Sequence, residues 1–155
     1  MPKPADTVTS KAGSSTPALS DDLSFLLARA NAISLAAGNA ALAAHGLKAR
    51  SYSVLLLTTD DARPSQREIA EFLRLDPSQV VSLVDNLQSR GLVERRTDPA
   101  DRRANVVVAT DAGRRLAAVA RESARVAEEQ VHGQLTPDER QMLTGLLRVL
   151  AFPES

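Results

Sequence analysis

The stretch that decides the fold runs from Ser65 to Gly113 and reads SQREIAEFLRLDPSQVVSLVDNLQSRGLVERRTDPADRRANVVVATDAG. It opens with a capping box, in which Ser65 caps a helix and Glu68, three residues later, returns the hydrogen bond. Leu75 marks the expected end of this short helix. The apolar spacing predicts a buried face made of Ile69, Ala70, Phe72 and Leu73.

A second helix is predicted immediately afterwards. Asp76 is its expected N-cap, Pro77 fits the first helical position, and Gln79 is expected to close a second capping box. Gly91 is the expected C-terminal stop. The residues expected to pack inward are Val80, Val81, Val84 and Leu87. Two short helices joined by a tight turn form a helix-turn-helix.

The apolar period changes after Gly91. Residues 92–96 read as a strand and the β-branched residues 105–109 as its partner, with a polar loop at 97–104 between them. We call this predicted β-hairpin, residues 92–109, the wing. A helix fits the major groove of B-DNA, which is about 12 Å wide, and a hairpin beside it can reach phosphates or the minor groove. The pattern therefore predicts a winged helix-turn-helix.

Helical patterns flank this stretch on both sides. A long helix is expected from Ser20, as its N-cap, to about Gly46, and a shorter one over 49–60. A third follows Thr110, and the last begins at a capping box formed by Thr136 and Glu139. The fold class is thus mainly α with a small β-hairpin wing. Residues 1–19, rich in Pro, Ser and Thr, are expected to be a disordered tail.

The expected domain is single and covers residues 20–155. Residues 49–109 form its DNA-binding lobe. The segments 20–48 and 110–152 carry leucine-bearing helices that lack an obvious partner inside a small winged helix. Pairing across a two-fold axis would bury them, so these segments are expected to be dimerisation helices.

Composition excludes several functions. The chain of 155 residues has 19 Lys and Arg, 19 Asp and Glu, no Cys and only two His. Disulfides, thiolate zinc sites and thiol redox sensing are therefore excluded, and neither a metal site nor a cofactor is expected. No nucleophile motif or glycine-rich phosphate loop points to an enzyme. Neither a secretory signal nor an apolar run of about 18 residues is found, so a cytoplasmic protein without a membrane partner is expected.

Positive charge is concentrated locally on this neutral chain. Seven arginines and four acidic residues between Arg90 and Arg115 give this segment a net charge of +3. Arginine suits bidentate contacts with phosphate and guanine. The candidate DNA-binding residues are Ser65, Arg67, Ser78, Gln79, Ser82, Arg90, Arg95, Arg96, Asp101, Arg102 and Arg103.

Several of these candidates have a structural alternative. Gln79 could serve only as a cap, and Arg90 could only satisfy carbonyls at a helix C-terminus. Asp101 and Arg103 could form an internal pair that stiffens the loop. Arg95 and Arg96 are balanced between phosphate contact and a solvated strand face.

The same residues carry a resemblance to a known family. The helix-turn-helix, the DPADRR loop with its Asp101-Arg102-Arg103 sequence, and the strand that ends in TDAG resemble the winged helix of the MarR family of bacterial transcription regulators. The resemblance covers roughly residues 20–152. It implies a homodimer, a palindromic double-stranded DNA site, and repression relieved by a small ligand, with activation left open.

In the resembled family, ligands lie between the first, second and fifth helices. The resemblance therefore makes the polar residues of the first two helices candidates for an effector site, where an arginine could pair with an aromatic carboxylate. These candidates are Arg29, Asn39, His45, Arg50 and Tyr52. Their structural alternatives are a dimer ion pair for Arg29 and a helix-end or core role for His45.

A second function class stays open at this point. A winged helix can act as a protein–protein interaction module without DNA specificity. The arginine-rich wing argues against this alternative, because an interaction module does not need several arginines beside a helix that fits the major groove.

Overall fold

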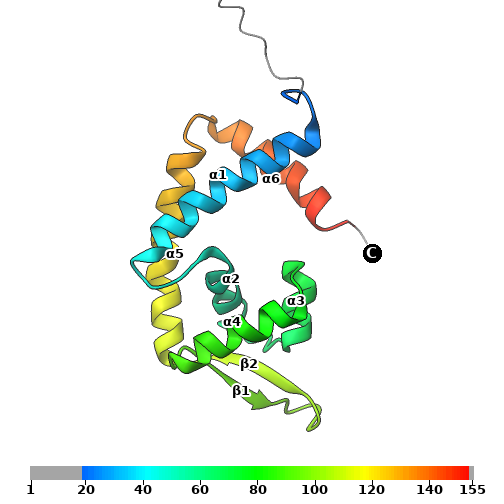
Figure 1. Cartoon of the computed structure of the whole chain (residues 1–155), viewed down its shortest axis with the longest axis vertical. Coiled ribbons are helices and arrows are strands. Elements are labelled where there is room, and N and C mark those ends of the chain that lie inside the picture. Colours follow the sequence, from blue (N-terminus) through cyan, green and yellow to red (C-terminus); the bar gives the residue numbers. More distant parts are fainter. Residues whose placement is uncertain (1–18, 154–155) are drawn as a thin grey trace, which may run out of the picture. The chain divides into compact units, whose positions relative to one another are not determined.

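The computed structural model describes residues 19–153, and this part of the chain contains six helices and one two-stranded sheet (Figure 1). The fold class is mainly α with a β-hairpin, as the sequence predicts. The expected tail, residues 1–19, lies outside the described residues apart from Leu19. The elements are α1 (Leu23–Ala43), α2 (Ala49–Leu57), α3 (Gln66–Leu73), α4 (Pro77–Ser89), β1 (Val93–Thr97), β2 (Asn105–Ala109), α5 (Asp111–Val131) and α6 (Pro137–Ala151).

The chain divides into two compact units, Met1–Ala32 and Ile33–Ser155, and α1 runs from the first into the second. The expected N-cap at Ser20 is wrong. The helix begins at Leu23, and the side chain of Asp22 accepts the backbone N–H of Phe25 at 2.7 Å. An aspartate directly before the first helical residue satisfies an N–H that would otherwise have no partner.

Helix α1 also corrects an expectation about apolar length. It is 21 residues long and, by length and composition alone, apolar enough to cross a membrane. One such helix near an N-terminus is weak evidence for a membrane span, because a helix that packs against protein passes the same test.

The C-terminal stop of α1 agrees with the sequence: Gly46 has a φ of +64°, and Leu47 donates its N–H to the carbonyl of Leu42.

The core of the second unit joins α2, α3, α4, the sheet and α5. Its fully buried side chains include Leu42 near the end of α1, together with Val54, Leu55, Ile69, Val80, Val84, Leu87, Val93, Val107 and Ala120. Helix α2 ends at Leu57, earlier than residue 60, because the N–H groups of Thr58 and Thr59 bond carbonyls only three residues back and the helix closes there. The core fixes the placement of α4 against α2 and α3.

The turn between α3 and α4 contains a residue in an unusual conformation. Helix α3 ends at Leu73, and Arg74 follows with a φ of +53°, a left-handed conformation that costs a non-glycine residue about 1 kcal/mol. The N–H of Leu75 then bonds the carbonyl of Ala70 at 3.0 Å. Leu75 thus lies beyond the helix end rather than at it. This tight turn sets the angle at which α4 leaves α3.

The hairpin is antiparallel, with Val93 opposite Ala109 and Thr97 opposite Asn105. Its first strand lies one residue later than the predicted 92–96. The outer edge of β2 is covered by the segment before α3, because Val107 donates its N–H to Pro64 at 2.8 Å and Ala109 donates to Thr58 at 2.9 Å. Covering this edge prevents it from pairing with another strand.

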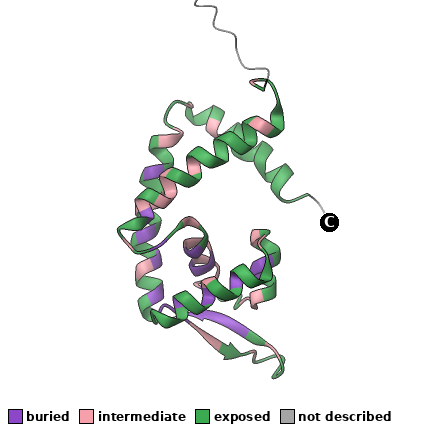
Figure 2. Ribbon diagram, viewed as in Figure 1, coloured by how far each residue is buried: buried purple, intermediate pink, exposed green. Residues whose placement is uncertain are grey.

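Two apolar predictions differ from the structure. Phe72 and Val81 were expected to be buried, but 56% and 40% of their surfaces are exposed. Phe72 follows Ile69 by three positions and Val81 precedes Val84 by three, so both lie at the edge of the apolar stripe rather than at its buried centre. Helix α6 has no buried residue, and Figure 2 shows most of it exposed, in agreement with the expectation that its leucines lack a partner within the chain.

Candidate nucleic-acid interface

Helix α4 presents one polar face to solvent. Val80, Val84 and Leu87 are buried on its inner side, which fixes its rotation about its own axis. Ser78, Gln79 and Ser82 are exposed on the outer side. The helix has 13 residues and is about 20 Å long at 1.5 Å per residue. These dimensions suit a helix that enters the major groove end first.

The N-terminus of α4 is capped by Asp76. Its carboxylate accepts the backbone N–H of Ser78 at 2.8 Å and the hydroxyl of Ser78 at 2.5 Å, and these bonds lower its pKa. The expected capping box with Gln79 does not form: the Asp76 side chain caps the N–H of Ser78, and no bond from the Gln79 side chain back to Asp76 is present. Capping thus does not occupy the Gln79 side chain. The hydroxyl of Ser82 donates to the Ser78 carbonyl at 3.1 Å.

Aspartates shape the loop of the wing. The Asp101 side chain accepts the backbone N–H of Arg103 at 2.9 Å, and the Asp98 side chain accepts that of Ala100 at 2.8 Å. Asp101 therefore fixes the backbone of Arg103 and not its guanidinium, so the anticipated alternative of an internal side-chain pair is not seen. Within residues 19–153, no ion pair involves Arg102 or Arg103. Their exposed guanidinium groups are available for a ligand of negative charge.

The two strand arginines differ from the loop arginines. Arg96 pairs with Glu94 two residues earlier on the same strand. Arg95 contacts Gln66, Gln88 and Asp85, and only 28% of its side chain is exposed. These contacts favour an intramolecular role for Arg95 over a solvated strand face.

Arg90 also has partners within the chain. Its guanidinium donates to the carbonyls of Gly46 at 2.7 Å and His45 at 3.2 Å, just beyond the end of α1. It thus acts as a cation at a helix C-terminus, but of α1 and not of its own helix. This contact is the reason to remove Arg90 from the residues that we assign to DNA.

The start of α3 has the capping box that the sequence predicts. Ser65 accepts the N–H of Glu68, and the carboxylate of Glu68 accepts both the backbone N–H and the hydroxyl of Ser65 at 2.7 Å. These bonds lower the pKa of Glu68. Arg67 pairs with Glu71 at 2.8 Å, but 87% of its side chain is exposed, so an exposed ion pair of this kind exchanges easily for a phosphate.

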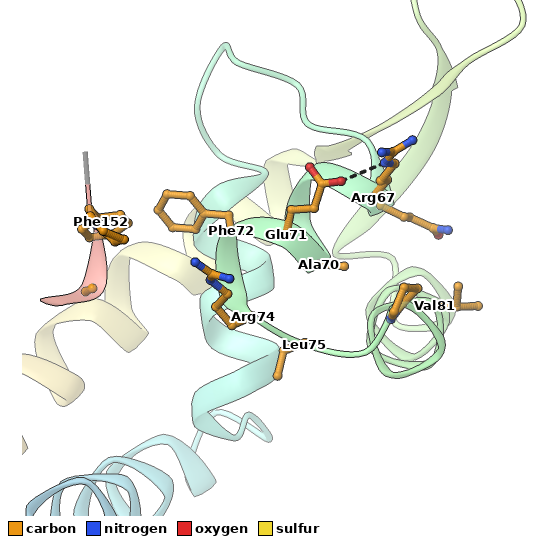
Figure 3. Close-up of a pocket in the computed structure, with 12 residues that line it drawn as sticks. Arg67, Ala70, Glu71, Phe72, Arg74, Leu75, Val81 and Phe152 are labelled. Atoms are coloured by element: carbon orange, nitrogen blue, oxygen red, sulfur yellow. Dashed lines mark hydrogen bonds and ion pairs between the residues drawn. The ribbon is translucent and has the colours of Figure 1, made fainter. Parts of the chain in front are cut away.

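An open groove of about 1090 Å³ lies beside α3, α4 and the end of α6 (Figure 3). The exposed side chains of Phe72 and Val81 line it, and the rings of Phe72 and Phe152 lie 5.7 Å apart. Arg67 and Arg74 also line it, and Figure 3 shows Arg74 between Phe72 and Leu75. The two exposed apolar side chains thus face this groove.

The candidate effector residues do not gather at one place. Asn39 and Arg50 line one cavity of about 460 Å³. His45 bonds the hydroxyl of Ser123 at 2.8 Å, and Arg29 belongs to the first unit. Burial raises the pKa of Tyr52, while the nearby Arg121 opposes that shift.

The cavity that contains Asn39 and Arg50 also has members that sequence reasoning missed. They are Leu35, Gly46, Lys48, Ser51, Leu83 and Asn86. Leu83 and Asn86 belong to α4, so this cavity adjoins the helix of the candidate interface. No sequence signal pointed to them, because their meeting depends on how α1, α2 and α4 pack.

Two further residues of the interface escaped the sequence analysis. Gln66 and Gln88 accept hydrogen bonds from Arg95 at 2.8 Å each. Gln88 follows Asp85 by three positions. This spacing places both residues on one face of a helix, and it can be seen in the sequence.

Among residues 19–153 there is no group of three or more His, Cys, Asp or Glu side chains arranged to hold a metal ion.

Comparisons with known proteins point in one direction. A sequence model described as MarR family matches residues 45–104. The chain is similar to the crystal structure of a MarR-family transcriptional regulator from Rhodococcus sp. RHA1, with 40% identity over 90% of this chain and 100% of that one and a TM-score of 0.83.

Two further structures show relatives with bound partners. CouR from Rhodococcus jostii RHA1, solved with p-coumaroyl-CoA, is 42% identical over 90% of this chain and 99% of that one, with a TM-score of 0.83. The transcriptional repressor CouR on a 23-mer DNA duplex is 31% identical over 86% of this chain and 94% of that one, with a TM-score of 0.79. The chain matches 63% and 61% of the lengths of two curated transcriptional regulators, from Thauera aromatica and Pseudomonas putida.

Proposed function

Because the chain belongs to the MarR family of transcriptional regulators, we propose that it is a homodimeric cytoplasmic repressor that binds a palindromic double-stranded DNA site. A small acidic ligand releases it from that site. The protein is not an enzyme. The observation that carries this proposal is the pair of exposed loop arginines, Arg102 and Arg103, which have no ion-pair partner among residues 19–153.

The DNA-facing surface consists of one helix face and one loop. Exposed polar residues of α4 read base edges in the major groove, and the wing arginines grip phosphate or enter the minor groove. Arg67 and Arg96 add phosphate contacts by exchanging their carboxylate partners for DNA. The residues that we assign to DNA are Ser65, Arg67, Ser78, Gln79, Ser82, Arg96, Asp101, Arg102 and Arg103, with Ser65 and Asp101 acting through the backbone geometry that they fix.

The dimer follows from exposed apolar surface. Helix α6 exposes Met142, Leu146 and Leu150, each by 60% or more. A contiguous apolar surface on one helix marks an interaction site, and a second copy of the same helix satisfies it in an isologous interface. The two copies of α4, related by this two-fold axis, then meet half-sites about 34–36 Å apart, one turn of the duplex.

The cavity of about 460 Å³ is the proposed effector site. Leu35 and Leu83 supply apolar walls, and Lys48 and Arg50 supply positive charge. This combination suits an aromatic or acyl body that carries a negative group. The CoA thioester held by CouR has both features. An occupant would touch α4 through Leu83, so its binding energy can favour a position of α4 that does not fit DNA.

The test is a fluorescence anisotropy titration with the intergenic DNA upstream of the protein's own gene. A scrambled duplex and two salt concentrations serve as comparisons. We expect at least 10³-fold preference for the specific duplex, a palindromic footprint, and release by a member of a panel of aromatic acids and their CoA thioesters. Equal affinity for both duplexes, together with capture of a protein partner, would make the chain an interaction module.

The effector site has its own test. Arg50→Ala should leave DNA affinity unchanged and raise at least 10-fold the ligand concentration required for release, because the ligand loses one of its two cationic partners, the one that can bind a negative group in a bidentate way. Arg125→Ala, on the exposed surface of α5, is the matched control. Release by the same ligand concentration in Arg50→Ala would place the effector elsewhere.

A further inference from the structure

Arg95 connects three secondary structure elements through one side chain. From β1, its Nε donates to Gln66 of α3 at 2.8 Å, its Nη1 donates to Gln88 of α4 at 2.8 Å, and its Nη2 donates to Asp85 of α4 at 2.6 Å. Each of the three guanidinium nitrogens thus has an acceptor within the protein. No other arginine among residues 19–153 has hydrogen-bond partners on two different helices outside its own element.

The geometry of the guanidinium makes this arrangement directional. The group is planar and its five N–H donors point in fixed directions, so three acceptors around it define a plane. Asp85 and Gln88 are three residues apart and hold one edge of the group from the same face of α4. Gln66, at the first position of α3, holds Nε. The strand is therefore fixed in angle against both helices of the helix-turn-helix.

We propose that Arg95 is a positioning residue for DNA recognition, which sets the angle between the wing and α4 and does not itself bind DNA. This inference rests on the proposed function. Phosphate contact is disfavoured because Asp85 already neutralises the charge of Arg95, whose side chain is only 28% exposed. The loop arginines, by contrast, are exposed and without such a partner.

The two roles predict different binding behaviour. Specific binding requires α4 and the wing to engage one duplex at the same time, whereas non-specific binding requires only positive charge near phosphates. A positioning residue therefore affects the specific affinity and spares the non-specific one. A phosphate-binding residue affects both, and its removal reduces the slope of log K against log salt by about 0.9 for each phosphate that it neutralises.

The experiment compares Arg95→Lys, Asp85→Asn and the double variant in the anisotropy titration, at several salt concentrations and against both duplexes. Lysine keeps the charge but cannot form the planar fork. We expect Arg95→Lys to lower the specific affinity about 10-fold, with unchanged non-specific affinity and salt slope. Asp85→Asn should act in the same direction, and the double variant should be no worse than the more severe single one, since both remove one interaction. Arg125→Lys, on the exposed surface of α5, is the control.

A second measurement, made without DNA, tests the structural role of Arg95 independently of the proposed function. Amide hydrogen exchange of the hairpin, residues 93–109, should become faster in Arg95→Lys, while that of the buried core of α5 should not change. A parallel decrease in affinity for both duplexes with a lower salt slope would identify Arg95 as a phosphate contact and overturn the inference. Specific affinity within twofold of the unsubstituted protein, or unchanged hairpin exchange, would overturn it as well. A lack of preference by the unsubstituted protein would instead overturn the proposed function and, with it, the role of Arg95 in recognition.

Discussion

Gly113 lies so close to the carbonyl oxygen of Leu92 that a Cβ atom at this position would be 1.9 Å from that oxygen. The same oxygen accepts the N–H of Thr110 at 3.0 Å, and the hydroxyl of Thr110 caps α5 at the N–H of Gly113. The start of α5 and the start of the wing thus meet backbone to backbone. The glycine of the TDAG sequence is required by this close approach.

Gly113→Ala is therefore expected to destabilise the fold. The contact is with backbone, which cannot rotate away, so the destabilisation should lie near the upper end of overpacking effects, about 3 kcal/mol in the free energy of unfolding. Thermal or urea unfolding followed by circular dichroism measures it. Gly38→Ala is the control, because nothing lies within 4 Å of a Cβ at that helical position, and it should stabilise the helix by about 0.5–1 kcal/mol. Equal unfolding midpoints for the two variants would contradict the close approach.

Arg103→Ala is expected to weaken specific and non-specific DNA binding together. The side chain is exposed and contributes charge to the wing, and phosphate contacts dominate affinity without reading sequence. Anisotropy titrations over a range of salt should show a slope smaller by about 0.9 for each phosphate that Arg103 neutralises in the unsubstituted protein. Arg125→Ala should leave both affinities unchanged. An unaltered salt dependence in Arg103→Ala would remove the wing from the interface.

Acid is expected to weaken the cap of α4. The Ser78 hydroxyl and N–H lower the pKa of Asp76, so its bonds stabilise the fold above the ordinary carboxyl pKa and are lost as pH falls through the lowered value. The free energy of unfolding should therefore fall below about pH 4. Asp76→Asn keeps a capping side chain without a titrating group, so part of this pH dependence should disappear. Unfolding of both proteins at pH 7 and pH 3 measures the difference, and the same acid dependence in both would refute this role for Asp76.

Leu146→Glu is expected to disrupt association. Leu146 is 60% exposed on α6 in the single chain, so the change should not disturb the core described above. Placing a charge in an apolar interface costs several kcal/mol, since the carboxylate must be desolvated. Light scattering at micromolar concentration should show a dimer for the unsubstituted protein and a smaller species for the variant. Thr144→Glu places the same charge elsewhere on the same helix and serves as the control for position. A monomeric unsubstituted protein would refute the dimer.

Several local signals in the sequence predicted the ends of elements correctly, although the N-cap at Ser20 and the end of α2 at residue 60 were wrong. The capping boxes Ser65–Glu68 and Thr136–Glu139, the proline at the start of α4 and the positive φ of Gly91 all appear in the structure as expected. Each of them depends on residues within a few positions of one another. Such short-range hydrogen bonds and backbone preferences are readable without knowledge of the packing.

Longer-range relationships were not readable in this way. Periodicity predicted Phe72 and Val81 as buried, but which part of an apolar stripe is covered depends on the neighbouring elements. The three partners of Arg95 lie 7, 10 and 29 positions away along the chain. One cap was also predicted with the wrong partner: the Asp76 side chain accepts the N–H of Ser78, and the box with Gln79 is absent.

The exposed apolar surface of α6 links gene control to the concentration of the protein. If the dimer forms through this helix, chains below the dissociation constant are mostly single and each carries half of the operator-binding surface. Occupancy of a two-fold operator then rises with the square of the chain's concentration, so doubling its expression raises occupancy about fourfold in this range. Operator occupancy by such a regulator therefore depends on its own concentration as well as on the concentration of its ligand.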